Sequence, residues 1–180
     1  MSAVLHAALK FAVKAHRKAD RDGADPLPYV THSMDVVNRL RYVGLVCDEH
    51  VLVAGMLHDV LEETTVKPPQ IFEEFGGEVL DLVLEMTRQE PELSTHDLAP
   101  EEIWHIRSMA LLEEVGRMSP EAQSIKLADR TSNVVAASAS REGDKLNRYL
   151  EQSRWILERI PESVNPRLWH GLSVLLARNA

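Results

Sequence analysis

The sequence predicts an all-α fold of about eight helices in one domain, and three observations support this prediction. The chain has 180 residues, close to the size of one ordinary domain. Apolar residues recur at helical spacing along most of the chain, and no segment keeps the two-residue alternation of a half-buried strand. Apolar residues make up 44% and charged residues 27% of the chain, as in ordinary globular proteins. We therefore expect a single unit over residues 1–180 with a sizeable core.

Capping and breaking residues place the helices of the first part of the chain. An apolar stripe predicts a helix over residues 3–13, and the Gly-, Asp- and Pro-rich segment 17–28 reads as a polar loop. A second helix is expected over residues 29–44. Its core face should consist of Val36, Val37, Leu40 and Val43. Asp48 is a good N-cap for a third helix over residues 48–63, which is apolar on most sides and is therefore expected at the centre.

Prolines and a serine mark the starts of later helices. Pro68 and Pro69 open a short helix, and Ser119 caps a long one whose first residue is Pro120. The polar segment 88–100 is expected to be a loop. The remaining helices are expected at residues 78–87, 101–117, 143–160 and 165–178.

The charge balance excludes some classes of partner. The chain has 20 Lys and Arg against 28 Asp and Glu, a formal net charge of −8, which argues against binding a nucleic-acid polymer or a membrane surface. No apolar run approaches the roughly 18 residues that span a bilayer. The single cysteine, Cys47, cannot form an intrachain disulfide. We expect a soluble, cytoplasmic protein that can still hold a small phosphorylated ligand with a few local cations; its oligomeric state is open.

The expected central helix carries charged groups in an apolar setting. His58 and Asp59 lie near its end, followed by Glu62 and Glu63. Burying such groups costs free energy unless something binds them. In a continuous helix Glu62 lies over His58 and Glu63 over Asp59, because residues four apart share a face.

Two more residues complete a candidate metal site if their helices pack against this one. His32 begins the second helix, and Asp129 lies in the apolar segment IKLADR. The full set is His32, His58, Asp59 and Asp129. Two imidazoles and two carboxylates suit a divalent transition metal, and mixed ligation favours manganese or iron over magnesium. Such an ion lowers the pKa of bound water and polarises a phosphoryl oxygen, with the acidic pair beside it for proton transfer. A single buried histidine, taken alone, is more often a core group with satisfied hydrogen bonds than a metal ligand.

Local cations near these residues are candidates for holding a phosphorylated ligand. The loop before His32 holds Arg17, Lys18 and Arg21. Lys126 and Arg130 flank Asp129, and Asn133 lies one turn later on the same face. Each of these also has an ordinary structural role open to it: the cations as solvated surface groups, Arg130 in an ion pair with a metal-binding carboxylate, and Asn133 in a polar pocket.

Four motifs occur in a specific order. They are AH…R…PYVTH (15–32), LHDVLEET (57–64), FGGEVLDLV (75–83) and IKLADRTSN (125–133). This series resembles the HD-domain hydrolases of the RelA/SpoT family, and more narrowly the small stand-alone alarmone hydrolases, over about residues 5–150. The resemblance implies an HD-type helical fold, with the helices of 143–178 completing it, and manganese-dependent removal of the 3′-pyrophosphate of guanosine tetra- and pentaphosphate.

The resemblance also implies roles for individual residues. The metal ligands fall on His32, His58, Asp59 and Asp129. The catalytic acidic pair falls on Glu62 and Glu63, and nucleotide contacts fall on Arg21 and Asn133. This chain departs from the usual pattern at Asp22, Ser33, Glu63, Thr131 and Ser132. The substrate-side departures leave open the hydrolysis of another nucleotide. Glu63, where the family usually has Asp, leaves open a metal-binding module that senses a nucleotide with little or no turnover.

Overall fold

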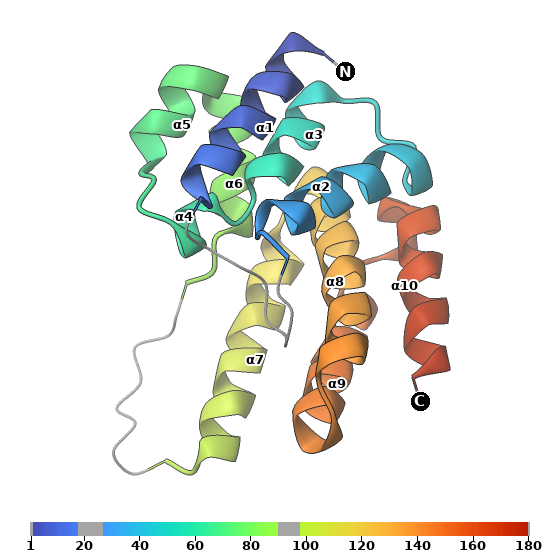
Figure 1. The fold of residues 1–180 in the computed structure, drawn as a ribbon. Coiled ribbons are helices and arrows are strands. Elements are labelled where there is room, and N and C mark those ends of the chain that lie inside the picture. Colours follow the sequence, from blue (N-terminus) through green and yellow to red (C-terminus); the bar gives the residue numbers. More distant parts are fainter. Residues whose placement is uncertain (1, 18–26, 90–97, 180) are drawn as a thin grey trace.

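The computed structural model describes residues 2–17, 27–89 and 98–179, and the regular structure within these ranges is helical (Figure 1). The first helices are α1 (Ala3–Ala15), α2 (Val30–Asn38), the π-helix η1 (Arg39–Val43), α3 (Glu49–Leu57), α4 (Val60–Glu63), α5 (Pro68–Phe75) and α6 (Gly77–Met86). They are followed by α7 (Pro100–Arg117), α8 (Pro120–Ser140), α9 (Gly143–Arg159), the 3-10 helix η3 (Glu162–Val164) and α10 (Pro166–Arg178). The predicted all-α class is confirmed. None of the described helices combines the length and the apolar character that crossing a membrane requires.

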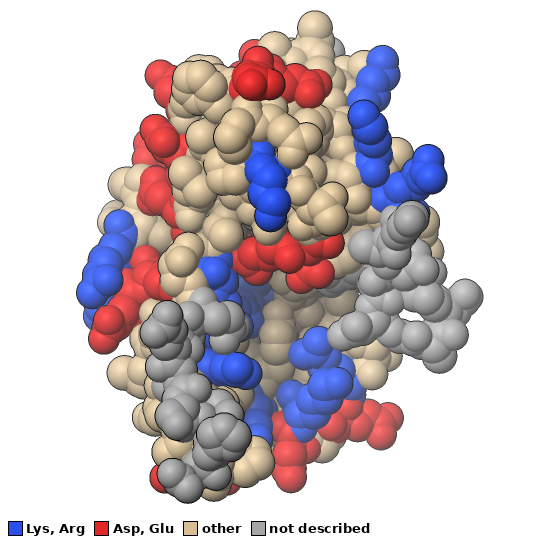
Figure 2. All heavy atoms as spheres, turned by 90° about the vertical axis from the view of Figure 1, so that its left-hand side faces the viewer, with Lys and Arg blue, Asp and Glu red and all other residues tan. Residues whose placement is uncertain are grey.

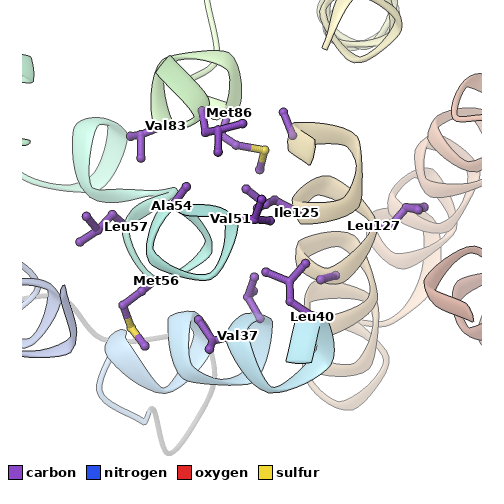
Figure 3. Packing of buried hydrophobic residues seen from close by; sticks show 14 of the residues in the cluster. Val37, Leu40, Val51, Ala54, Met56, Leu57, Val83, Met86, Ile125 and Leu127 are labelled. Atoms are coloured by element: carbon purple, nitrogen blue, oxygen red, sulfur yellow. The ribbon is translucent and has the colours of Figure 1, made fainter. Parts of the chain in front are cut away.

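Helix α3 lies at the centre of the N-terminal part, as predicted. Every residue from Val51 to Leu57 is buried, and α3 contacts α1, α2, α6 and α8. Figure 3 shows α3 enclosed by these neighbours, with Val51 and Ala54 directed into the shared core. The carboxylate of Asp48 caps the helix by accepting a hydrogen bond of 2.8 Å from the His50 amide. A helix that is apolar all round is stable only when it is enclosed, so its sequence fixes its central position.

The expected helix over residues 48–63 is interrupted, which corrects the prediction of a continuous helix. Residues 58 and 59 form a turn between α3 and α4. The Nδ1–H of His58 donates to the carbonyl oxygen of Gly55 at 2.9 Å. A continuous helix would pair that carbonyl with the amide of Asp59, so the imidazole competes with the backbone ladder at this point. The turn therefore places His58 and Asp59 at a junction between two helices and not on the face of one.

Helix α8 packs against both the N-terminal helices and the C-terminal helices. It contacts α2, α3 and α6 on one side and α9 and α10 on the other, and in Figure 1 it extends with α7 and α9 away from the N-terminal helices. Ser119 and Pro120 begin it as predicted, with Ser119 Oγ accepting from the Ala122 amide at 3.2 Å. Because α8 is packed on several sides, polar residues in its middle are buried, including Lys126, Asp129 and Arg130.

The prediction that Val43 belongs to the core is wrong. Val43 is 42% exposed, whereas Leu40, also expected in the core, is fully buried. The chain changes from α-helical to π-helical pairing at Arg39, and the amide of Gly44 bonds to the Arg39 carbonyl five residues earlier at 2.9 Å. The extra residue per turn rotates the positions that follow it, which takes Val43 off the core face.

Candidate metal centre and active-site cleft

The four predicted metal ligands converge on one point. His32 comes from α2, His58 and Asp59 from the turn after α3, and Asp129 from α8. The Nε2 atom of His32 lies 3.4 Å from Asp59 Oδ2 and 3.2 Å from Asp129 Oδ1, and the Nε2 atom of His58 lies 3.1 Å and 3.6 Å from the same two oxygens. Neighbouring ligands at right angles around an ion with bonds of about 2.1 Å lie about 3 Å apart. The spacing therefore fits a cation between the imidazoles and the carboxylates.

The hydrogen bonds of the two imidazoles direct their free nitrogen atoms toward this point. His58 Nδ1 is bonded to the carbonyl of Gly55, which can only accept, so His58 Nδ1 carries the proton in the neutral ring. His32 Nδ1 lies 3.1 Å from Ser132 Oγ. Both Nε2 atoms are buried and have no hydrogen-bond partner of acceptable geometry in the described structure. Two buried ring nitrogens beside two carboxylates form a possible donor set for a divalent ion, since metal-binding histidines hold their second nitrogen in this way.

The charges of the cluster reinforce this fit. Burial lowers the pKa of His58, but the neighbouring carboxylates of Asp59 and Asp129 outweigh it and raise that pKa to about 10. Burial raises the pKa of Asp59, and the His58 charge more than offsets this and holds it far below its usual range. Burial likewise raises the pKa of Asp129, but the Lys126 ammonium and the two histidines outweigh burial and hold this pKa well below its usual range. Without a metal, the buried carboxylates thus retain a proton on His58, and a divalent ion would have to displace this proton in order to use the nitrogen as a ligand.

Neighbouring side chains fix the orientation of the Asp129 carboxylate. The amide of Asn133 donates to Oδ1, the oxygen that faces both histidines. The Nζ atom of Lys126 lies 3.6 Å from Oδ2. Both residues were predicted to contact the nucleotide, and both also line the cleft described below. The structure thus gives both residues contacts to Asp129, a predicted metal ligand, in addition to a place in the lining of the cleft.

Two site residues were missing from the predicted set. The hydroxyl of Tyr29 donates to Asp59 Oδ2 at 2.7 Å, and Ser132 contacts His32. Tyr29 lies one helical turn before His32, and Ser132 lies three residues after Asp129, so helical spacing from the predicted ligands could have found both.

A cleft of about 540 Å³ opens beside the cluster. Figure 2 shows a hollow on this side of the molecule, with acidic side chains along one edge and basic side chains around the other. Its charged lining consists of Asp59, Glu62, Glu63 and Asp129 with Arg88, Lys126, Arg130 and Arg141. The predicted acidic pair and three of the four predicted substrate contacts therefore share one cleft. Arg21, the fourth, lies outside the described residues.

Glu62 has an environment suited to proton transfer. Partial removal from water raises its pKa above the usual value; the amide of Arg88, which donates to its Oε1, opposes this change, and the nearby charge of Asp59 adds to it. A carboxylate with a raised pKa is a better base near neutral pH. The bond to Arg88 also holds the end of the segment after α6 beside the cleft.

Arg130 contributes a buried guanidinium to the cleft. It is 6% exposed, its Nη1 donates to Gln152 at 3.4 Å, and its guanidinium carbon lies 4.8 Å from the centroid of the Tyr149 ring. Arg141 lies over the same ring at 4.9 Å. The sequence motifs end before Tyr149 and Arg141, so nothing in those motifs indicated that α9 lines the cleft.

Comparison with known proteins agrees with this geometry. Residues 8–153 match the HD domain family. The chain is 32% identical over 126 residues to a Drosophila melanogaster protein named guanosine-3′,5′-bis(diphosphate) 3′-pyrophosphohydrolase MESH1, a match that covers 70% of this chain and 65% of that protein. It is 30% identical to the Homo sapiens protein of the same name, over 74% of this chain and 69% of that one.

Two solved structures have a fold similar to that of this chain. A structure described as a metazoan ortholog of SpoT that hydrolyzes ppGpp superposes with a TM-score of 0.86 at 26% identity, covering 100% of this chain and 97% of that one. A Listeria monocytogenes protein superposes with a TM-score of 0.61 at 25% identity, over 82% of this chain and 97% of that one. The predicted resemblance to the HD-domain hydrolases is confirmed, and the chain belongs to the HD domain family.

Proposed function

We propose that the protein is a metal-dependent phosphohydrolase that removes the 3′-pyrophosphate from guanosine 3′,5′-bis(diphosphate). The convergence of two buried imidazole nitrogens and two carboxylates at the wall of a polar cleft carries this proposal. The names of the MESH1 relatives support the choice of reaction and substrate.

The metal ligands in this proposal are His32, His58, Asp59 and Asp129. We infer that the ion is manganese, because two nitrogen and two oxygen ligands suit it better than magnesium. When bound, a divalent ion of this kind supplies Lewis acidity toward a phosphoryl oxygen and lowers the pKa of water.

Glu62 and Glu63 are the proposed proton-transfer groups. Both line the cleft beside Asp59. Hydrolysis of the 3′-ester requires a proton to leave the attacking water and one to reach the departing 3′-oxygen, so that guanosine 5′-diphosphate and pyrophosphate are formed. The raised pKa of Glu62 favours its role as the base.

Substrate binding is assigned to the positive side of the cleft. Lys126, Arg130 and Asn133 line it, and Arg21 is proposed from the sequence to join them. The four acidic and four basic side chains of the lining balance, so a divalent ion gives the cleft a local positive charge. This accounts for binding of a polyphosphate by a protein of net charge −8. A single domain over 1–180, a cytoplasmic location and the absence of nucleic-acid or membrane partners stay predictions.

The test is a panel of nucleotides incubated with purified protein and Mn²⁺, with products separated by anion-exchange chromatography. We expect pyrophosphate and guanosine 5′-diphosphate from the bis(diphosphate). Turnover of a different nucleotide, with none of this substrate, would replace the specific reaction by another phosphohydrolase activity. Tight binding without any turnover would show a sensing module instead.

A further inference from the structure

We infer that His16 is a positioning residue for the metal centre, which holds the Tyr29 ring so that its hydroxyl fixes the Asp59 carboxylate. This inference rests on the metal site proposed above. It assigns a role to a buried imidazole that lies outside the proposed ligand set.

The Tyr29 hydroxyl acts on a carboxylate oxygen that faces both histidines. It donates to Asp59 Oδ2 at 2.7 Å, and this same oxygen lies 3.1 Å from His58 Nε2 and 3.4 Å from His32 Nε2. A hydrogen bond to one carboxylate oxygen fixes the rotation of the group. Outer hydrogen bonds of this kind orient metal ligands and contribute to metal affinity.

Two ring contacts support the Tyr29 side chain. The His16 ring lies parallel to it, with centroids 4.6 Å apart and an interplanar angle of 16°. The ring of His32 also lies edge-on to Tyr29, with centroids 6.0 Å apart. Tyr29 immediately precedes α2 and its side chain does not cap that helix, so these ring contacts contribute to the position of the ring.

His16 makes this contact with its ring face. It follows α1 directly, is 4% exposed, and neither of its ring nitrogens has a hydrogen-bond partner in the described structure. A buried polar ring without polar partners is costly compared with an apolar one of the same shape. The flat face against Tyr29 is therefore the feature that we expect to matter, and another flat ring should replace it.

The experiment measures Mn²⁺ affinity of the chelator-treated full chain by competition with a coloured chelator. We expect His16→Ala and Tyr29→Phe each to weaken Mn²⁺ binding about 10-fold or more, the effect typical of outer hydrogen-bond partners. His16→Phe keeps a flat ring and should stay close to the wild-type affinity. His16→Leu fills the volume of the imidazole but has no flat face, so it should weaken Mn²⁺ binding as much as His16→Ala does. It replaces His16→Ala in the experiment if the alanine variant folds poorly.

A double-mutant cycle shows whether His16 acts through the hydroxyl. In a Tyr29→Phe background, His16→Ala should change the affinity much less than it does in the wild type, because the bond that it supports is already absent. Phe11→Leu is the matched control: Phe11 lies on α1 as well, but packs edge-on against Phe75 at 5.4 Å. That variant should lower the melting temperature and leave the affinity unchanged.

Three results would overturn the role of His16: an unchanged affinity in His16→Ala, fully additive effects in the cycle, or a His16→Phe variant as weak as His16→Ala. Failure of the wild-type protein to bind Mn²⁺ would be a different outcome. It would overturn the proposed metal centre itself, and this inference with it.

Discussion

The Nε2 atom of His32 lies 3.2 Å from Oδ1 of Asp129, although the two residues come from helices far apart in the sequence. Helices α2 and α8 pack directly against each other and against α3, which brings the turn with His58 and Asp59 to the same point. The apolar surfaces of three helices thus assemble a polar cluster that none of them contains alone.

His58 is expected to be essential for metal binding. In His58→Gln the side-chain amide can still donate to the Gly55 carbonyl, but the Nε2 lone pair is lost. We expect Mn²⁺ affinity to fall more than about 100-fold, beyond the effect typical of outer partners. Competition titration with a coloured chelator measures it. His50→Gln, at an exposed site where the ring contacts Glu78, should bind like the wild type. Equal affinity in the two variants would remove His58 from the ligand set.

Stability without metal should depend on pH in a defined way. The pKa of His58 is raised from 6.5 to about 10, so its contribution is fully present below pH 6.5 and is lost as the pH rises toward 10. The pKa values of Asp59 and Asp129 are lowered, so their contributions are present above their usual range near pH 4 and are lost in acid. With chelator present, the melting temperature should therefore fall as the pH rises above about 6.5.

Metal should reverse this trend, because Mn²⁺ displaces the His58 proton more easily at higher pH. The increase in melting temperature on adding Mn²⁺ should grow from pH 6 to pH 9. An increase that is the same at every pH would show that no proton is released when the ion binds.

Glu62 should affect turnover and not metal binding. Glu62→Gln keeps an oxygen that can accept from the Arg88 amide but cannot take a proton. We expect kcat to fall about 10²- to 10⁴-fold at saturating Mn²⁺, with an unchanged Mn²⁺ affinity. In the wild type, kcat should decline in acid with a pKa above 4.5, because burial raises the pKa of Glu62, and the variant should lack this decline. A small loss of kcat would assign the base to Glu63.

Arg130 should contribute to substrate binding. The variant Arg130→Gln removes a buried cation from the cleft and leaves a shorter, neutral polar side chain. We expect KM to rise about 10-fold or more, since a charge-assisted hydrogen bond contributes about 1.5–3 kcal/mol. The Mn²⁺ affinity should not change. Arg117→Gln, at the exposed end of α7, serves as the control. An unchanged KM would leave Arg130 with its contacts to Gln152 and Tyr149 alone.

The sequence predicted the helices well because their ends carry local signals. Asp48, Ser119 and Pro120 act where they stand, as caps and first residues, whatever the rest of the chain does. Two errors arose where non-standard pairing replaced the regular ladder. The π-helix at Arg39–Val43 and the turn at His58–Asp59 depend on packing and on one side-chain hydrogen bond, which periodicity does not reveal.

The convergence of the four predicted ligands could be anticipated only as a condition, that three helices pack together. The structure satisfies that condition for His32, His58, Asp59 and Asp129, while their role as ligands stays a prediction. Tyr29 and Ser132 could have been found from helical spacing. Tyr149 could not, because it reaches the cleft through the packing of α9 against α8, and neither could Arg141, which directly follows α8 and lies over the Tyr149 ring.

The most direct test is a titration of chelator-treated protein with Mn²⁺ while pyrophosphate release from guanosine 3′,5′-bis(diphosphate) is followed. We expect no release without metal, and activity that rises with bound Mn²⁺ and reaches its maximum at one ion per chain. Full activity in the presence of chelator, or one bound ion per chain with no hydrolysis of any nucleotide, would contradict the assignment of the His32–His58–Asp59–Asp129 cluster as the metal centre of a phosphohydrolase.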